Sequence, residues 1–179
     1  TSFKAPTPLE LKHDYLWRVH AHAPPRGEVA VFNRSHYEDV LIARVDKLVP
    51  DPVWMARYEQ INHFEKLLVD SGTRIVKIFL HISKNEQKLR FEERLADRTK
   101  QWKFDPGDLR KRDQWDEYRA AFESALSRCS TAHAPWHSVP GDRKWMRDFA
   151  VSQILLQEFE QMPLRWPKPT FDPQQIRIR

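Results

Sequence analysis

A dense group of polar side chains follows a short apolar run early in the chain. The segment Asn33–Asp39 reads NRSHYED and comes directly after the run Val29–Phe32. Arg34 offers a planar fork that matches the oxygens of a phosphate. Ser35 is suited to cap a following helix, whose N-terminus is itself an anion site. An ordinary helix cap with solvated charges explains the same residues, so this segment alone leaves both interpretations open.

A second group of cations lies in the middle of the chain. Arg90, Arg94 and Arg98 recur every four residues, which places them on one face of a helix, and Lys103 continues the basic character. Arginines on a helical flap stabilise a phosphoryl group during transfer, because that reaction depends mostly on positioning and charge neutralisation. The alternative is a solvated helix face paired with its own glutamates.

Apolar runs and helical periodicity alternate along the chain, and they indicate the elements that must position these residues. Short apolar runs predict buried strands at residues 28–32 and 73–82, and a third short strand is predicted at residues 136–139. Helical spacing, caps and breakers predict helices at residues 8–23, 51–70, 84–98 and 107–129, and another after Gly141. The proline-rich basic tail, residues 163–179, is predicted to form an extended arm.

Strands that alternate with long helices predict an α/β fold with a parallel sheet and right-handed crossovers, arranged in three layers. In such folds ligands bind at the carboxyl ends of the strands. The polar segment after residue 32 and the basic helix after residue 83 both follow predicted strands. We therefore expect the two groups of cations to serve one site.

Composition narrows the classes of protein. The chain has 179 residues, 40% hydrophobic and 31% charged, which suits one folded domain. No segment approaches the roughly 18 apolar residues of a membrane helix, so no membrane association is expected. Cys129 is the single cysteine, which predicts a reducing compartment, the cytoplasm. The net charge of +5 suits an anionic partner, but a solvated basic surface is the simpler explanation of net charge alone.

Several separated segments, in order, resemble the polyphosphate kinase type 2 family. They are Ser2–Thr7 (SFKAPT), Phe32–Leu41 (FNRSHYEDVL), Phe79–Lys84 (FLHISK), Trp102–Phe104 (WKF), Asp142–Trp145 (DRKW) and Pro167–Thr170 (PKPT). The resemblance implies a P-loop kinase fold with a helical lid over about residues 83–128. It also implies Mg²⁺-dependent phosphoryl transfer between inorganic polyphosphate and an adenine or guanine nucleoside mono- or diphosphate, in a homo-oligomer.

The resemblance also assigns roles. Asn33, where many relatives carry aspartate, and Arg34 occupy the Walker B segment, and Arg94 matches a phosphate-gripping position in the lid; these three are the expected catalytic residues. Residues expected to bind phosphate or nucleotide are Lys4, Ser35, Tyr37, Arg90, Arg98, Lys103, Asp142 and Lys144. Asn33, Glu38 and Asp39 are the expected metal ligands, with Asn33 the weaker donor because its amide is neutral.

One departure concerns the phosphate-binding loop. Members of the family carry a glycine-rich Walker A loop that ends in Gly-Lys, upstream of the segment that matches Thr1. The four glycines of this chain are Gly27, Gly72, Gly107 and Gly141, and none precedes a lysine. We therefore expect residues 1–162 to be a partial P-loop kinase-like domain that lacks its first strand and P-loop, and that is inactive alone.

A second hypothesis belongs to another class: a non-catalytic module that binds polyphosphate or other polyanions through the same arginines. Such a module needs no phosphate loop, and it would bind with steep salt dependence and no Mg²⁺ requirement. RNA binding rests only on basic and aromatic composition, so nucleic acid is not an expected partner.

Overall fold

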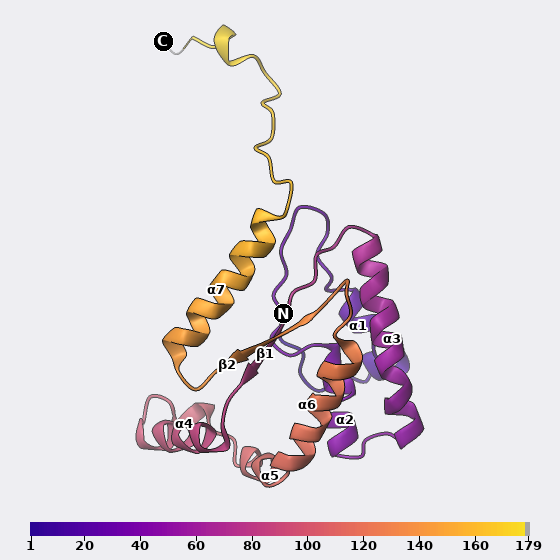
Figure 1. The fold of residues 1–179 in the computed structure, drawn as a ribbon, viewed down its shortest axis with the longest axis vertical. Coiled ribbons are helices and arrows are strands. Elements are labelled where there is room, and N and C mark those ends of the chain that lie inside the picture. Colours follow the sequence, from indigo (N-terminus) through magenta and orange to yellow (C-terminus); the bar gives the residue numbers. More distant parts are fainter. Residues whose placement is uncertain (178–179) are drawn as a thin grey trace.

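The computed structural model describes residues 1–177, and Figure 1 shows their arrangement. The helices and strands, in chain order, are α1 (Trp17–His20), α2 (Ile42–Val45), α3 (Asp51–Asp70), β1 (Lys77–His81), α4 (Lys84–Ala96), α5 (Gly107–Asp113), α6 (Trp115–Cys129), β2 (Trp136–Pro140) and α7 (Lys144–Glu160). Single turns of 3-10 helix are η1 (Glu10–Lys12), η2 (His36–Asp39), η3 (Gln101–Lys103) and η4 (Pro173–Gln175). The α/β class is therefore confirmed.

The sheet is small and parallel. Strands β1 and β2 pair in parallel, from Lys77 opposite Trp136 to His81 opposite Pro140. Helix α7 lies on one side of these strands, and α6 and α3 lie on the other (Figure 1). Because the two strands are parallel and in this register, their carboxyl ends lie at the same edge, where the predicted site residues follow them.

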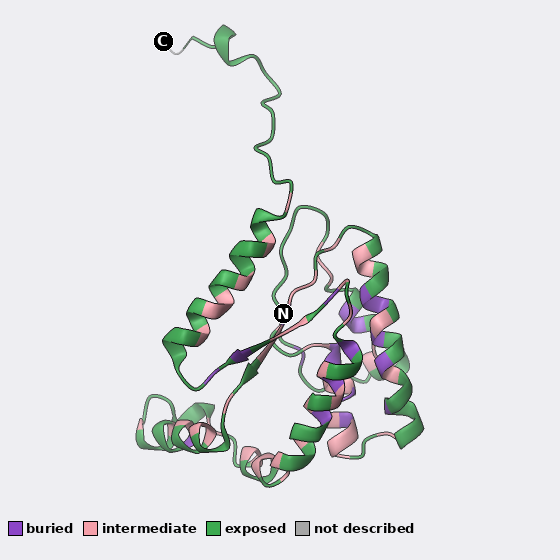
Figure 2. Ribbon diagram, in the orientation of Figure 1, coloured by how far each residue is buried: buried purple, intermediate pink, exposed green. Residues whose placement is uncertain are grey.

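Most of the core lies between α3 and α6, on the side of the sheet away from α7 (Figure 2). Helix α3 buries Trp54, Tyr58 and Ile61, at the helical spacing that predicted this element. Helix α6 meets them with a stripe of small residues, Ala121, Ala125 and Cys129, which are at most 2% exposed. Small side chains every four residues allow the two helices to pack closely.

The N-terminal helix predicted for residues 8–23 is wrong, because the segment forms two short turns. Thr7 and Glu10 cap each other: the Thr7 N–H donates to Glu10 Oε2 (2.6 Å), and the Glu10 N–H donates to Thr7 Oγ1 (3.3 Å). The chain then leaves the helix after Lys12. Asp14 starts the next turn by accepting from the Trp17 N–H (3.1 Å), so two competing caps divide the segment.

The strand predicted for residues 28–32 is also wrong. Only an isolated parallel bridge between Ser2 and Asn33 forms here, and Val29 and Val31 are 73% and 74% exposed. Gly27, at φ 86°, turns the chain into this segment. An apolar run becomes a strand only when neighbouring backbone accepts and donates its hydrogen bonds, and within the described residues it has almost no such neighbour.

Two predicted helix boundaries need correction. Helix α4 starts after Ser83, whose Oγ accepts from the Glu86 N–H (3.1 Å) as predicted, but it ends at Ala96 and leaves Arg98 in a turn. The helix predicted for residues 107–129 is two helices, α5 and α6, which change direction at Gln114. Gln114 is not a helix breaker, so the tertiary contacts of the two halves cause the break.

Helix α7 and the tail have little contact with the core. None of the α7 residues is buried, and residues 163–177 run as an exposed, mostly extended segment in which Trp166 is 94% exposed (Figures 1 and 2). Residues 178–179 of the predicted arm lie outside the described part of the chain. Among residues 1–177, no helix is both long and apolar enough to cross a membrane.

Candidate functional site

The carboxyl edge of the sheet brings two chain segments together. The Gly141 N–H, just after β2, donates to His81 O (2.6 Å) at the end of β1. The Ser83 N–H donates to Asp142 Oδ1 (2.8 Å), and this hydrogen bond lowers the pKa of Asp142. A Cβ on Gly141 would lie 2.7 Å from Ile82 Cγ2, so only glycine permits this close approach.

A cavity of about 960 Å³ opens at this edge, between the ends of both strands and helices α4, α5 and α6. Its wall is mostly apolar and carries aromatic residues, cations and two acids. The aromatic residues are Phe79, Trp115, Tyr118 and Phe122, the cations are Lys84, Lys111 and Arg119, and the acids are Glu123 and Asp142. Aromatic faces suit a planar ring and cations suit phosphate. The cavity thus has the chemistry to hold a nucleotide.

The polar segment after residue 32 forms an exposed loop. Asn33 and Arg34 are both exposed, and the Asn33 N–H donates to Thr1 O (2.8 Å) beside the Ser2–Asn33 bridge. Arg34 has φ 62°, a left-handed conformation that non-glycine residues seldom adopt. Ser35 caps η2, as predicted, by accepting from the Tyr37 N–H (3.4 Å).

The two acids of this segment are half-buried. Burial raises the pKa of Glu38, and the nearby charge of Arg34 acts in the opposite direction. Burial also raises the pKa of Asp39, against the lowering effect of Arg57, whose Nη1 lies 3.2 Å from Asp39 Oδ1. Glu38 therefore lies in the field of Arg34, whereas Asp39 is already paired.

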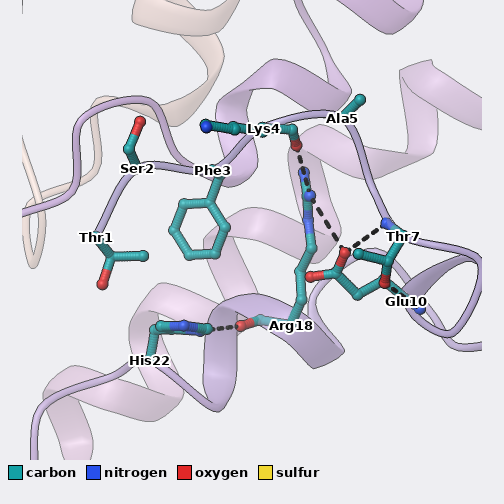
Figure 3. Close-up of a pocket in the computed structure, with 9 residues that line it drawn as sticks. All are labelled: Thr1, Ser2, Phe3, Lys4, Ala5, Thr7, Glu10, Arg18 and His22. Carbon is teal, nitrogen blue, oxygen red and sulfur yellow. Dashed lines mark hydrogen bonds and ion pairs between the residues drawn. The ribbon is translucent and has the colours of Figure 1, made fainter.

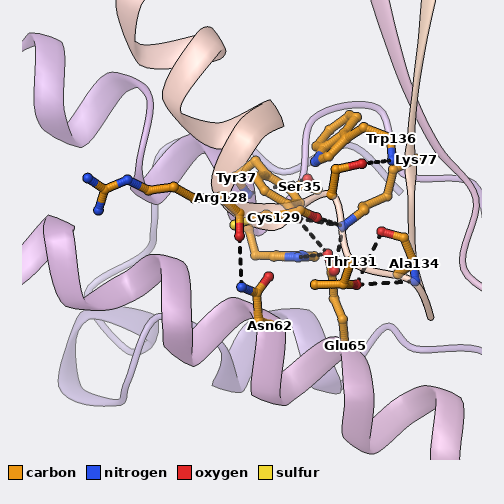
Figure 4. Close-up of polar contacts among 12 residues, drawn as sticks. Ser35, Tyr37, Asn62, Glu65, Lys77, Arg128, Cys129, Thr131, Ala134 and Trp136 are labelled. Atoms are coloured by element: carbon orange, nitrogen blue, oxygen red, sulfur yellow. Dashed lines mark hydrogen bonds and ion pairs between the residues drawn. The ribbon is translucent and has the colours of Figure 1, made fainter.

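Tyr37 lies below the loop rather than on it. Its side chain is 4% exposed, and its hydroxyl donates to Glu65 Oε1 (2.8 Å) and accepts from Lys77 Nζ (2.9 Å), as Figure 4 shows. The hydroxyl expected to bind substrate is thus used inside the protein. Sequence reasoning missed Glu65 and Lys77, although both are charged residues at positions where the apolar pattern predicts core.

Lys4 lies two residues after Ser2, on the other chain segment of the Ser2–Asn33 bridge. Its carbonyl accepts from Arg18 Nη1 (2.9 Å), while its side chain is exposed (Figure 3). Arg18 is 8% exposed and lies over the ring of Phe3. Because the bridge between Ser2 and Asn33 is parallel, Lys4 and Arg34 leave it in the same direction.

The arginines of α4 differ from one another. Arg90 donates to Glu86 Oε1 (2.8 Å) and to Gly141 O (2.6 Å), so it joins the helix to the loop after β2. Arg94 is half-buried, with its guanidinium over the Phe91 ring (5.7 Å). Arg98 is exposed beyond the helix end. Of the three, Arg90 is already committed to protein partners.

The remaining predicted residues lie on exposed surface near α4. Lys103 Nζ lies over the Trp102 ring at 5.1 Å from its centre. Lys144 Nζ is 4.0 Å from Glu93 Oε2, so the first residue of α7 contacts α4.

The predicted residues thus form two groups rather than one cluster. Lys4 and residues 33–39 make the first group, and α4 with residues 141–144 makes the second. Lys111 of α5 connects their surroundings: it forms a hydrogen bond with Asp46, and its charge acts on Glu38. Within residues 1–177, no three His, Cys, Asp or Glu side chains gather closely enough to hold a metal by themselves.

Comparison with known proteins covers nearly the whole chain. The family model of polyphosphate kinase 2 matches residues 1–166. A curated relative from Meiothermus ruber, named AMP/ADP-polyphosphate phosphotransferase, is 49% identical over 99% of this chain and 66% of its own length. An ADP-polyphosphate phosphotransferase from Rhodopseudomonas palustris is 42% identical over 94% of this chain and 63% of its own.

A solved structure agrees. The crystal structure of polyphosphate kinase 2 from Arthrobacter aurescens superposes with a TM-score of 0.94 at 48% identity, covering 97% of this chain and 62% of that one. This chain therefore spans somewhat less than two thirds of the length of these relatives. The resemblance predicted from separated motifs is confirmed, and the chain belongs to the polyphosphate kinase 2 family.

Proposed function

We propose that this chain is part of a phosphotransferase that moves a phosphoryl group between inorganic polyphosphate and a nucleoside mono- or diphosphate. The observation that carries this proposal is the 49% identity, over 99% of the chain, to a relative named for this activity with AMP and ADP. The two groups of cations around the carboxyl edge of the sheet support it, since both substrates are polyanions.

Within this proposal Arg34 of the loop and Arg94 of the lid have the same role. Arg34 and Arg94 neutralise charge on the transferring group, because both present a guanidinium that is exposed or half-buried and not paired with a carboxylate in the described structure. Lys4, which leaves the Ser2–Asn33 bridge in the same direction as Arg34, binds the polyphosphate chain. Ser35, Arg98 and Lys103 extend the phosphate-binding surface.

The acceptor nucleotide would occupy the cavity at the sheet edge. Its aromatic wall stacks the base, adenine or guanine, and its cations meet the phosphates. Asp142 lies on the wall of this cavity. Lys144, through Glu93 of α4, and Arg90, through Gly141, support the wall from outside the cavity. No covalent enzyme intermediate is needed, because positioning and charge neutralisation are sufficient for this class of transfer.

Mg²⁺ is the expected cofactor, and the residues present fit a shared site. Mg²⁺ usually keeps several waters and binds through one or two carboxylates plus substrate phosphates, so it does not require three protein ligands. Glu38 and Asn33 would hold it; Asp39 fits less well because Arg57 already pairs with it. When bound, the ion would neutralise charge on the phosphates.

We further propose that the complete domain is a three-layer P-loop kinase fold with a central strand beside residues 28–33. The exposed Val29 and Val31 support this, because they lack the neighbouring strand and the covering helices that a buried strand requires. The lid would end before the second half of α6 rather than at residue 128, because Ala121, Ala125 and Cys129 pack in the core. Self-association is supported by exposed Trp145 and Phe149 on α7.

The test is formation of ADP or ATP from polyphosphate, Mg²⁺ and AMP or ADP. We would assay the chain alone and the chain with an upstream glycine-rich loop segment attached. Activity that requires the upstream segment and is lost in Arg34→Ala and Arg94→Ala supports the proposal. The matched control is Arg74→Ala, which removes an exposed arginine that pairs with Glu158. Salt-sensitive polyphosphate binding without any activity would instead support a polyanion-binding module.

A further inference from the structure

A buried polar network connects Glu65 and Lys77 to Tyr37, three residues after Arg34 in the chain (Figure 4). Glu65 of α3 is fully buried, and its Oε1 accepts from the Tyr37 hydroxyl (2.8 Å) and lies 3.2 Å from His36 Nε2. Its Oε2 accepts from Lys77 Nζ (2.5 Å). His36, Tyr37 and Lys77 are each at most 8% exposed. The network is therefore shielded from water.

Each donor of the lysine in this network has a partner. Lys77 Nζ donates to Glu65 Oε2, to the Tyr37 hydroxyl (2.9 Å) and to Cys129 O (2.6 Å), which uses all three ammonium hydrogens. These bonds join α3, the start of β1, the end of α6 and η2. The hydrogen bonds between α3 and η2 are those of Glu65 with His36 and Tyr37.

Stability alone does not explain the network. A buried ion pair recovers its desolvation cost only partly, and apolar side chains of the same volume often stabilise a core as well. What a set of directional bonds adds is a defined geometry. Here that geometry is imposed on His36 and Tyr37, which follow Arg34 by two and three residues.

The loop needs such support. Arg34 has φ 62°, a backbone conformation that costs energy in a non-glycine residue and persists only where its surroundings hold it. On one side the bridge between Ser2 and Asn33 fixes the chain. On the other side the hydrogen bonds to Glu65 fix η2. Arg34 and Ser35 lie between these two fixed points.

We propose that Glu65 is a positioning residue of the phosphate site: by holding His36 and Tyr37 it keeps Arg34 in its left-handed conformation, with the guanidinium exposed. Tyr37 acts through the same bonds and does not touch substrate. That the site binds phosphate rests on the proposed function. That the network orders the loop does not.

The first experiment measures loop order without any substrate. Hydrogen–deuterium exchange of residues 33–39 is compared in wild type, Tyr37→Phe and Glu65→Gln. The control is Ile61→Val, one turn earlier on α3, fully buried and apolar. We expect loop exchange about tenfold faster in Tyr37→Phe, with α4 unchanged. Loop exchange equal to that of Ile61→Val would overturn the proposal. Should Glu65→Gln not fold, Tyr37→Phe decides, since it removes one hydroxyl only.

The second experiment asks whether the effect on catalysis passes through Arg34. In the active protein that includes this chain, we expect Tyr37→Phe to lower kcat by about 10- to 100-fold, because small misplacements of a positioned group are costly. In an Arg34→Ala background the same change should have no further effect. An equal loss in both backgrounds would contradict positioning. Absence of activity in wild type would refute the proposed function, while the exchange result would still decide the role of Glu65.

Discussion

The two arginine-bearing regions of this protein are built in opposite ways. Arg34 lies on a short loop above a buried network of Glu65, Lys77 and Tyr37. Arg94 lies on α4, a helix that buries only Phe91 and contacts the sheet edge through few polar bonds. The loop of Arg34 is thus fixed to the core, whereas Arg94 lies on a helix at the surface of the protein.

Under the proposed function, this difference would divide the polyanion site between a fixed cation and a movable one. A fixed cation supplies a defined position for one phosphate without reorganisation. A cation on a loosely attached helix can close after the substrates have entered. The hydrogen bonds that join α4 to the sheet edge, from Ser83 to Asp142 and from Arg90 to Gly141, lie within its first two turns. Arg94, in its last turn, is farther from them along the helix.

The largest expected effect comes from breaking the buried network. Lys77→Met leaves the carboxylate of Glu65 buried without its cation, so the free energy of unfolding should fall by about 3–5 kcal/mol. Arg94→Ala, on the exposed helix α4, should change the free energy of unfolding by about 0.5 kcal/mol or less. Chemical denaturation measures both. Equal losses would remove the contrast between the two regions.

A change of pH should affect the same network. Burial by itself raises the pKa of Glu65, but hydrogen bonding from His36 and the charge of Lys77 bring it below its ordinary value of 4.5. A carboxyl with a lowered pKa in the folded state stabilises the protein above its unfolded pKa and loses this contribution as pH falls through the folded pKa.

The stability advantage of wild type over Glu65→Gln should therefore be constant above about pH 5.5 and shrink below pH 4.5. Denaturation series at several pH values measure this advantage. The expectation fails if the difference between the two proteins does not depend on pH between 3 and 7.

The close approach at Gly141 gives a smaller effect. In Gly141→Ala the new Cβ would lie 2.7 Å from Ile82 Cγ2, so the loop after β2 must shift, at a cost of about 1–3 kcal/mol. Gly107→Ala is the matched control, because its nearest contact is the movable Asp105 carboxylate at 3.1 Å. Thermal unfolding of both variants compares them; equal melting temperatures would argue against the close approach.

The smallest expected effect concerns the attachment of helix α4 to the sheet edge. Asp142→Asn weakens acceptance from the Ser83 N–H at the start of α4, so amide exchange in α4 should rise about threefold while residues 33–39 keep their rate. Exchange measured by mass spectrometry separates the two segments. A parallel rise in both would mean that they are not independent.

Local pattern was sufficient to predict several elements and much of the candidate chemistry. The spacing of Trp54, Tyr58 and Ile61 predicted α3, and the Ser83 cap predicted the start of α4. The short strand predicted at residues 136–139 is β2. Each of these signals arises from residues a few positions apart. Such local patterns predict elements correctly because the contacts that form these elements also join residues a few positions apart.

Features that depend on distant partners could not be predicted in this way. Residues 28–32 are apolar enough for a strand, yet the only neighbouring backbone in the described structure is at Thr1 and Ser2. The Thr1 ammonium donates to Val31 O (2.7 Å), and Ser2 forms the bridge with Asn33. The division of residues 107–129 into α5 and α6 has no local breaker. It reflects the bonds of Lys111 and Arg112 to other segments and the packing of α6 in the core.

By itself, the sequence determined the family, the α/β class and the two groups of cations, because motifs and periodicity are written in neighbouring residues. Tertiary structure alone decided that Glu65 and Lys77 pair in the core, that Tyr37 is buried with them, and that Arg90 bonds Gly141. Whether a charged side chain meets solvent, substrate or a partner depends on residues brought together across the chain. Burial and electrostatics are set by that assembly rather than by local pattern.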